Sequence, residues 1–154
     1  RAYPDRPFVG VGAVIFRDDE VLIAQRGKLP LRDTWSIPGG AQEIGETYVE
    51  AAIREVMEET CLEIEVLGLV DVVDSINRDE QGRVRYHYTL VDVVAEWRGG
   101  VAEAKDDLAA VKWVKIADID RYELRTVTRD VILMAQEMRE RTGASQRGGW
   151  PRKL

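Results

Sequence analysis

Apolar and β-branched residues gather in six runs along the chain; five of them predict β-strands, and the short run at residues 35–38 predicts an extended segment. The runs cover residues 8–17, 21–25, 35–38, 63–74, 84–97 and 111–116. Asp18-Asp19 separates the first two runs, and Asp79-Glu80-Gln81-Gly82 separates the two longest ones. Short polar segments of this kind between strands predict two hairpins.

Two further segments show helical periodicity. The first follows Gly45-Glu46-Thr47, where Glu46 is favourably placed near the positive end of a helix dipole. Its expected core-facing stripe consists of Val49, Ala52, Ile53, Val56 and Thr60. The second segment covers residues 127–141, and its expected apolar face consists of Val131, Met134, Ala135 and Met138. Strands interleaved with two helices favour an α/β fold in which helices cover both faces of a mixed β-sheet.

The length and hydrophobic content of the chain favour a single domain. Its 154 residues are of ordinary domain size, and a hydrophobic content of 45% is sufficient for a sizeable core. We expect this domain to cover residues 8–142, after an N-terminal segment of residues 1–7. Residues 143–154 have turn and linker composition, which predicts a flexible C-terminal tail.

Charge and composition exclude several classes of protein. The net charge of −6 argues against general nucleic-acid binding, although metal ions can join an acidic protein to a phosphate substrate. One cysteine excludes an internal disulfide, and one histidine excludes a zinc site built on histidines. Since neither a membrane span nor a signal peptide is evident, we expect a cytoplasmic protein.

Three glutamates and an arginine lie close together in the segment Arg54-Glu55-Val56-Met57-Glu58-Glu59. In a helix with about 100° per residue, Glu55, Glu58 and Glu59 fall within an arc of roughly 100°, beside the core-facing stripe. Like charges at this spacing repel one another, so the cluster does not serve to stabilise the helix. A divalent cation would neutralise it, and hard oxygen ligands suit Mg²⁺ or Mn²⁺.

The spacing around this cluster forms a longer pattern. Gly40 is followed after five residues by Glu46, and after seven more by Arg54 and the glutamates. The pattern resembles the signature sequence of the Nudix hydrolases, enzymes that cleave a nucleoside diphosphate linked to another group. The resemblance covers roughly residues 8–141 and implies an α/β/α sandwich with a mixed β-sheet.

The same resemblance implies roles for individual residues. The metal ligands or catalytic carboxylates would be Glu55, Glu58 and Glu59. Glu46 and Arg54 would orient them, and the Gly39 carbonyl would be a further metal ligand. Deprotonation of the attacking water would fall to Glu58, to Glu59 or to a carboxylate from outside the helix.

Cys61 departs from the family pattern, which has a glycine at this position. A glycine just past a helix end usually adopts a left-handed conformation that costs other residues roughly 1 kcal/mol. Because Cys61 is not at a ligand position, we expect an altered helix exit and an unchanged ligand set. A reactive cysteine is the other interpretation, but no activating neighbour is visible in the sequence.

Carboxylates outside the helix are candidates for a base or a further metal ligand. The segment Glu103-Ala104-Lys105-Asp106-Asp107 lies between two predicted strands, where members of the family often supply such a group. The candidates are Glu103, Asp106 and Asp107. The alternative for each of them is a solvated position in an acidic loop.

Candidates for substrate contacts come from two segments. Arg26 and Arg32 flank the loop before Trp35 and could hold a diphosphate, although solvated arginines are the alternative. In the strand segment Tyr86-His87-Tyr88, the two tyrosines lie on one face and His87 on the other. One of these three residues could stack on a base or ribose, and Tyr86 and His87 are our candidates for substrate binding. Packing in the core or an interface is the alternative.

The order of the segments WSIPGG, the signature, VVD, RYHY and KDD resembles ADP-ribose pyrophosphatase-type Nudix enzymes. That resemblance implies Mg²⁺-dependent hydrolysis of ADP-ribose, with Mn²⁺ as the alternative metal, to AMP and ribose 5-phosphate. A MutT-type nucleoside triphosphate pyrophosphohydrolase is a second hypothesis. A non-catalytic nucleotide-sensing protein is a third, and the full carboxylate set counts against it. Many ADP-ribose-cleaving relatives dimerise, and a hairpin over residues 71–97 could supply the interface.

Overall fold

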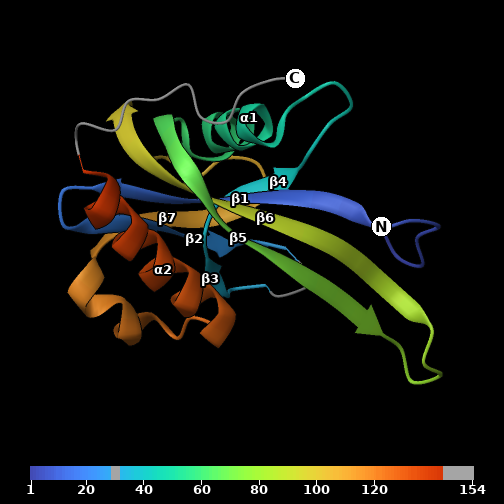
Figure 1. Ribbon diagram of the computed structural model, residues 1–154. Coiled ribbons are helices and arrows are strands. Elements are labelled where there is room, and N and C mark those ends of the chain that lie inside the picture. The colour runs from blue at the N-terminus through green and yellow to red at the C-terminus, as the bar shows by residue number, and fades with distance from the viewer. Residues whose placement is uncertain (29–31, 144–154) are drawn as a thin grey trace.

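The computed structural model describes residues 1–28 and 32–143 and shows a seven-stranded mixed β-sheet between helices (Figure 1). The strands are β1 (Phe8–Arg17), β2 (Glu20–Arg26), β3 (Trp35–Ser36), β4 (Gly39–Ala41), β5 (Glu63–Arg78), β6 (Val84–Gly99) and β7 (Leu108–Lys115). The helices are α1 (Tyr48–Thr60), the 3-10 helix η1 (Ile116–Tyr122) and α2 (Thr126–Thr142). Apart from Gly143, the expected C-terminal tail lies outside the described residues.

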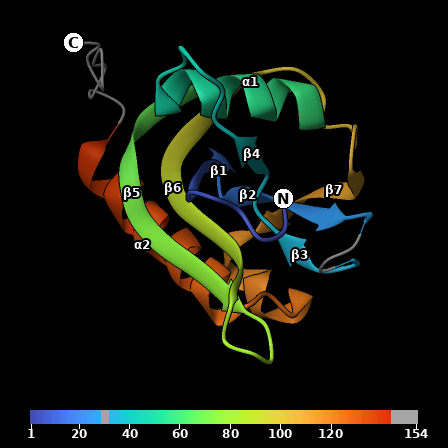
Figure 2. The same ribbon diagram turned by 90° about the vertical axis from the view of Figure 1, so that its right-hand side faces the viewer.

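Helix α1 covers one face of the sheet, and α2 covers the other (Figure 2). This arrangement confirms the expected α/β/α sandwich with a mixed sheet. None of the described helices is long and apolar enough to cross a membrane.

The centre of the sheet is the parallel pair of β1 and β6, in register from Phe8–Tyr88 to Phe16–Glu96. The strand order of the sheet is β3-β2-β1-β6-β5, with β4 also paired to β1 and β7 also paired to β2. All pairs other than β1 and β6 are antiparallel. Strand β1 is a nearly continuous apolar run because both of its faces are covered.

Alternate residues of β1 supply two separate cores. Val11, Ala13 and Ile15 pack in the cluster beneath α1, whereas Val14 and Phe16 pack in the cluster beneath α2. This alternation follows from the two-residue period of a strand. It also assigns even-numbered β1 positions to the α2 face of the sheet.

The buried face of each helix differs from the expected stripe. Helix α1 buries Ala51, Ala52, Val56 and Thr60, whereas Ile53 is 40% exposed. Helix α2 buries Thr128, Val131, Ile132 and Ala135, whereas Met134 is 41% exposed. The predictions for Ile53 and Met134 were therefore wrong. In α1 the small residues Ala51 and Ala52 lie against the sheet, where they allow a close approach of the helix backbone, whereas α2 buries the larger Val131 and Ile132.

The expectation of an altered helix exit at Cys61 was also wrong. Cys61 adopts the left-handed conformation, with φ 64° and ψ 15°, and its N–H donates to the Met57 carbonyl at 3.0 Å. The Cys61 carbonyl is packed against Gly100, where a β-carbon would collide with it. Cys61 therefore has the left-handed conformation that a glycine usually adopts at a helix end. The contact between the Cys61 carbonyl and Gly100 determines how the chain leaves α1.

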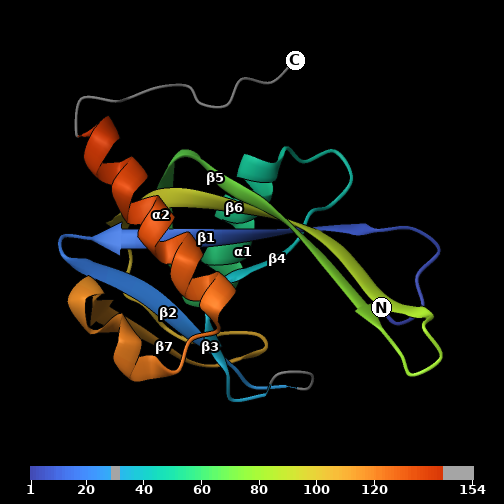
Figure 3. The ribbon, with the colours of Figure 1, turned by 60° about the horizontal axis from the view of Figure 1, so that its bottom comes forward.

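Strands β5 and β6 form a long hairpin that projects beyond the rest of the sheet (Figure 3). The N-terminal segment lies against this hairpin. The Tyr3 N–H donates to the Arg85 carbonyl at 2.7 Å, and the Tyr3 hydroxyl donates to Asp79 Oδ2 at 2.9 Å. Residues that precede the expected domain therefore contact the hairpin.

Candidate active site

A capping box determines where α1 begins. Thr47 Oγ1 accepts from the Glu50 N–H at 3.1 Å, and Glu50 Oε1 accepts from the Thr47 N–H at 2.9 Å. These reciprocal bonds satisfy two backbone donors that the first helical turn would otherwise leave unpaired. They fix the first turn of the helix that carries the glutamates.

Arg54 holds the carboxylates of the signature segment in place. Its Nε donates to Glu46 Oε2 at 2.6 Å, and its Nη2 donates to Glu46 Oε1 at 2.9 Å. The expected pair of Glu46 and Arg54 is therefore present, and the hydrogen bond from Arg54 lowers the pKa of Glu46. Arg54 Nη1 also donates to Glu55 Oε1 at 3.0 Å and to Glu58 Oε2 at 3.2 Å.

Gly39 and Gly40 bring strand β4 against both β1 and α1. A β-carbon at Gly39 would collide with the Val11 carbonyl, and one at Gly40 would collide with the Glu55 carboxylate. The Gly39 N–H donates to Glu59 Oε1 at 2.9 Å. The glycine pair is therefore needed for close approach, and it connects the strand to the third glutamate.

Negative charge is crowded at this junction. Burial is the largest cause that raises the pKa of Glu59 to about 7; the charges of Glu55 and Asp106 act in the same direction, and the Gly39 N–H and Arg26 oppose them. Burial likewise raises the pKa of Glu55. Crowded carboxylates of this kind favour a compensating cation, and their oxygen atoms are the ligands that Mg²⁺ and Mn²⁺ prefer.

The donor set suits a divalent metal ion, but Arg54 engages part of it. Within residues 1–28 and 32–143, no three acidic, histidine or cysteine side chains are already arranged around a common metal position. Glu55 and Glu58 are turned towards Arg54, and Glu59 is turned towards Gly39. The carboxylate oxygens therefore suit a divalent metal ion. Their present side-chain rotamers, however, are those of a cluster whose negative charge is neutralised by Arg54.

The three loop carboxylates differ in their surroundings. Glu103 pairs with Lys105 at 3.1 Å, and Asp107 pairs with Lys28 at 2.8 Å. The charge of Asp106, in contrast, acts on both Glu55 and Glu59. Backbone bonds attach this loop to the end of α1, since the Lys105 N–H donates to the Glu59 carbonyl at 2.9 Å. Asp106 is therefore the loop carboxylate that is near enough for its charge to act on the cluster.

A cavity of about 620 Å³ opens beside the cluster. Glu59 and the glycine pair of β4 line one side, and Tyr88, Leu90 and Asp92 of β6 line another. Arg26 contributes to the wall. Within the part of the chain that the structure describes, Arg32, Tyr86 and His87 are not among the lining residues.

Sequence reasoning missed two residues of this cavity as site residues, Asp92 and Arg125, and considered Tyr88 only as one of three neighbours that could stack on a base or ribose. The two-residue period of β6 places Tyr88 and Asp92 on the same face, and an acid within an apolar strand was an available signal. Arg125 precedes α2, and no local pattern connects it with the signature segment.

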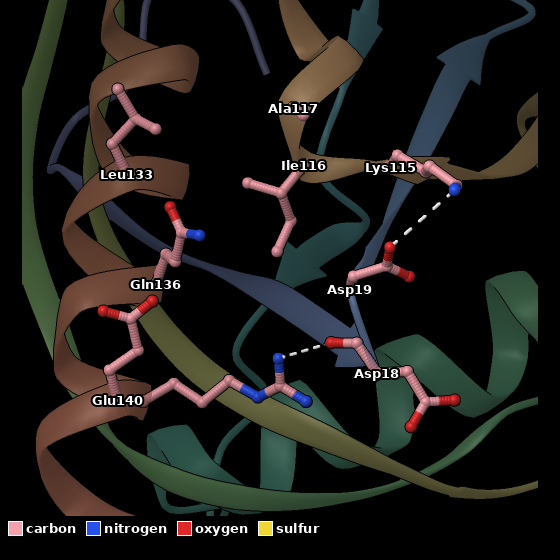
Figure 4. Close-up of a pocket in the computed structure, with 9 residues that line it drawn as sticks. Asp18, Asp19, Lys115, Ile116, Ala117, Leu133, Gln136 and Glu140 are labelled. Atoms are coloured by element: carbon pink, nitrogen blue, oxygen red, sulfur yellow. Dashed lines mark hydrogen bonds and ion pairs between the residues drawn. The ribbon is translucent and has the colours of Figure 1, made fainter.

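A second cavity, of about 550 Å³, lies between the β1–β2 turn and the C-terminal half of α2 (Figure 4). Arg139 ties the two elements together there, because it pairs with Glu96 and donates to the Asp18 carbonyl at 2.7 Å. None of the signature glutamates lines this cavity. The candidate active site is therefore the cavity beside Glu59.

Comparisons with known proteins bear on the family of this chain. The model of the NUDIX domain matches residues 6–135. ADP-ribose pyrophosphatase from Methanocaldococcus jannaschii is 33% identical over 115 residues, which are 75% of this chain and 66% of that protein. The chain spans 28% to 66% of the length of the first curated relatives that it matches.

Solved structures show the same fold. The crystal structure of a MutT NUDIX hydrolase from Burkholderia pseudomallei has a TM-score of 0.72 and 28% identity, over 84% of this chain and 98% of that one. A bifunctional NMN adenylyltransferase/ADP ribose pyrophosphatase from Francisella tularensis, complexed with AMP and a Mn ion, has a TM-score of 0.63 and 27% identity. That match covers 86% of this chain and 42% of the other. The domain match, the sandwich fold and the geometry around Arg54 together show that this chain belongs to the Nudix hydrolase family.

Proposed function

We propose that this protein hydrolyses ADP-ribose or a related nucleoside diphosphate derivative, with Mg²⁺ or Mn²⁺ as cofactor. The observation that carries the proposal is the position of Glu59. It belongs to the crowded glutamate cluster and lines the cavity that could receive a substrate. The similarity to an ADP-ribose pyrophosphatase over 75% of the chain supports this substrate class.

The proposed metal ligands are the three helical glutamates and the Gly39 carbonyl: Glu55, Glu58, Glu59 and Gly39. When bound, a divalent ion would polarise the phosphate oxygens and lower the pKa of an attacking water. Glu46 and Arg54 orient the ligands, as their hydrogen bonds indicate. Release of the ligands from Arg54 would accompany metal binding.

The reaction is the attack of water on a phosphorus atom of the diphosphate. A phosphorus–oxygen bond forms to the water, the bond from that phosphorus to the bridging oxygen breaks, and the other phosphate leaves with the bridging oxygen. With ADP-ribose the products are AMP and ribose 5-phosphate. We assign the proton acceptor to Glu58, Glu59 or Asp106, since each lies in the cluster or near it.

The lining of the cavity indicates how substrate would be held. Arg26 and Arg125 supply positive charge that suits a diphosphate, and Tyr88 supplies an aromatic side chain that could stack on a base or ribose. Arg32, Tyr86 and His87 lie outside this lining among the described residues. Of the three residues considered for stacking, we therefore assign the role to Tyr88.

Substitution of the glutamates tests the site. We expect Glu58→Gln and Glu59→Gln each to reduce Mg²⁺-dependent turnover of ADP-ribose by about 100-fold or more, because a neutral amide loses the ligand charge and the base. Product formation would be followed by chromatography. Glu137→Gln, an exposed position on α2, is the matched control. Wild-type turnover in both cluster variants, with folding intact, would rule out this site.

A MutT-type activity is the second candidate, and the match to a MutT NUDIX hydrolase favours it. The two activities differ in their products. ADP-ribose yields two monophosphates, whereas a nucleoside triphosphate yields a monophosphate and inorganic pyrophosphate. A panel of both substrate classes with Mg²⁺ or Mn²⁺ would decide between them.

A further inference from the structure

Asp92 is a buried carboxylate in the cavity wall, away from the glutamate cluster. It lies on β6, is 8% exposed and lines the cavity together with Tyr88 and Leu90. Its strand neighbours in register are Gly12 of β1 and Asp71 of β5. Two acidic residues therefore face each other across β5 and β6 at this point.

No folding role explains this arrangement. Among the described residues, no N–H or O–H group donates a hydrogen bond to the Asp92 carboxylate, and the charge of Asp71 opposes its ionisation. Burial and Asp71 together raise the pKa of Asp92 to about 6, so the group is mostly ionised at neutral pH. Among the described residues no fully enclosed side-chain oxygen lacks a partner, so the Asp92 oxygens are accessible from the cavity, where a ligand can donate hydrogen bonds to them.

The backbone of β1 leaves room around this carboxylate. A β-carbon at Gly12 would lie 2.5 Å from Asp92 Oδ1, and one at Gly10 would lie 2.9 Å from Leu90 Cδ2. Glycine at both positions therefore allows the Asp92, Leu90 and Ile37 side chains to lie directly over β1. The Asp92 oxygen lies where a side chain of β1 would otherwise fill the space.

The distance from the cluster indicates which part of a substrate would reach Asp92. Gly39, Gly12 and Asp92 are successive partners on β4, β1 and β6, so about two strand spacings, roughly 10 Å, separate the backbones of Gly39 and Asp92. A diphosphate held at the glutamate cluster would place its attached sugar or base in this direction. An ionised carboxylate repels phosphate and can only accept hydrogen bonds.

We propose that Asp92 is a specificity-determining residue that accepts hydrogen bonds from two adjacent donors on the uncharged part of the nucleotide substrate. The vicinal hydroxyls of a ribose are one source of such donors, and the N1–H and amino group of guanine are the other. Tyr88, two residues before Asp92 on the same face, would contact the same part of the ligand. The inference rests on the proposed function, because it takes the diphosphate to lie at the cluster.

A binding experiment tests this assignment without turnover. The probe is ADP-ribose in which a methylene group replaces the oxygen between the two phosphorus atoms, titrated calorimetrically in Mg²⁺. Companion probes lack the 2′-hydroxyl of the adenosine, lack the terminal ribose, or carry guanine in place of adenine. Each probe is titrated into the wild type, Asp92→Asn and Asp130→Asn, the last being an exposed aspartate on α2.

We expect Asp92→Asn to weaken binding of the preferred probe about 10- to 100-fold, the range for a lost hydrogen bond to a charged group. The probe that lacks the relevant donor should bind equally to wild type and variant. The hydroxyl probes and the guanine probe thereby identify the source of the donors. Asp130→Asn should bind every probe with the affinity of the wild type. The thermal unfolding temperature of Asp92→Asn should not be lower than that of the wild type.

Two outcomes would overturn the inference. One is wild-type affinity of Asp92→Asn for every probe, and the other is failure of the wild-type protein to discriminate among the probes. The second test needs no variant, so it holds even if Asp92→Asn does not fold. A wild-type protein that binds and discriminates the probes but does not hydrolyse ADP-ribose would contradict only the proposed function.

Discussion

At the scale of residues, the site depends on positions where a single side chain or its absence decides how closely the backbone can pack. Gly39 allows β4 to meet β1, and Gly40 leaves room for the Glu55 carboxylate. Cys61 shows the opposite case, because a residue with a β-carbon occupies a left-handed position at the end of α1. The packing of Gly100 against its carbonyl maintains that conformation.

The strain at Cys61 leads to a stability prediction. Cys61→Gly should raise the free energy of unfolding by about 1 kcal/mol, because glycine adopts a positive φ without a steric penalty. Urea denaturation monitored by tryptophan fluorescence would measure the change. Cys61→Ala is the matched control, since it removes the thiol and keeps the β-carbon. Equal stability of the glycine and alanine variants would contradict this account.

At the scale of elements, α1 both packs in the core and carries the reactive groups. Its buried face holds Ala51, Ala52, Val56 and Thr60, and the half-buried Glu55 and Glu59 adjoin the same face. Glu58 is exposed on the solvent side of the cluster. The carboxylates therefore lie at the border of the core, where burial raises the pKa of Glu59 and Glu55.

The capping box at Thr47 gives a prediction for this helix. Thr47→Ala should lower the free energy of unfolding by about 1 kcal/mol, because the Glu50 N–H loses its acceptor at the start of α1. Thr47→Ser keeps a hydroxyl at the cap and should retain most of the stability. The same urea denaturation would compare the three proteins, and a serine variant as unstable as the alanine variant would argue against the cap.

At the scale of the whole molecule, the β5–β6 hairpin gives the protein an exposed sheet edge. Strand β5 ends the strand order, and its outer half exposes Val72 at 51% and Ile76 at 47%. Edge strands with exposed apolar residues favour pairing with another chain. We therefore propose that a second copy of the protein covers this edge, in line with the dimer suggested by the family resemblance.

Sedimentation velocity tests this assembly. We expect the wild-type protein to sediment as a dimer at micromolar concentration and the double variant Val72→Lys/Ile76→Lys to sediment as a monomer, because two charges would then lie in the contact. Val101→Lys changes an 85% exposed apolar residue outside the hairpin and should remain dimeric. A monomeric wild type, or a dimeric double variant, would refute the assignment of the interface.

Local patterns predicted most of the elements. The expected strand over residues 8–17 has the same bounds as β1, and the two helices were located to within about a residue where bounds were predicted. Strand β4 and the helix η1 were not predicted. The three residues of β4 become a strand only by pairing with Gly10, Val11 and Gly12 of β1. No local periodicity in the sequence predicts this pairing.

The amino-acid sequence alone determined the family pattern and the glutamate cluster, because these depend on short spacings within one helix and the loop before it. The sequence left open whether Arg54 pairs with Glu46 or with a catalytic carboxylate, and in the structure Arg54 bonds to both. Only the tertiary structure decided that the charge of Asp106 acts on the cluster and that Tyr88 and Asp92 line the cavity. These residues are brought to Glu59 by loop attachment and by sheet pairing across β4, β1 and β6. Contacts between strands and loops distant in sequence leave no periodic signal in the chain, so folding was required to reveal them.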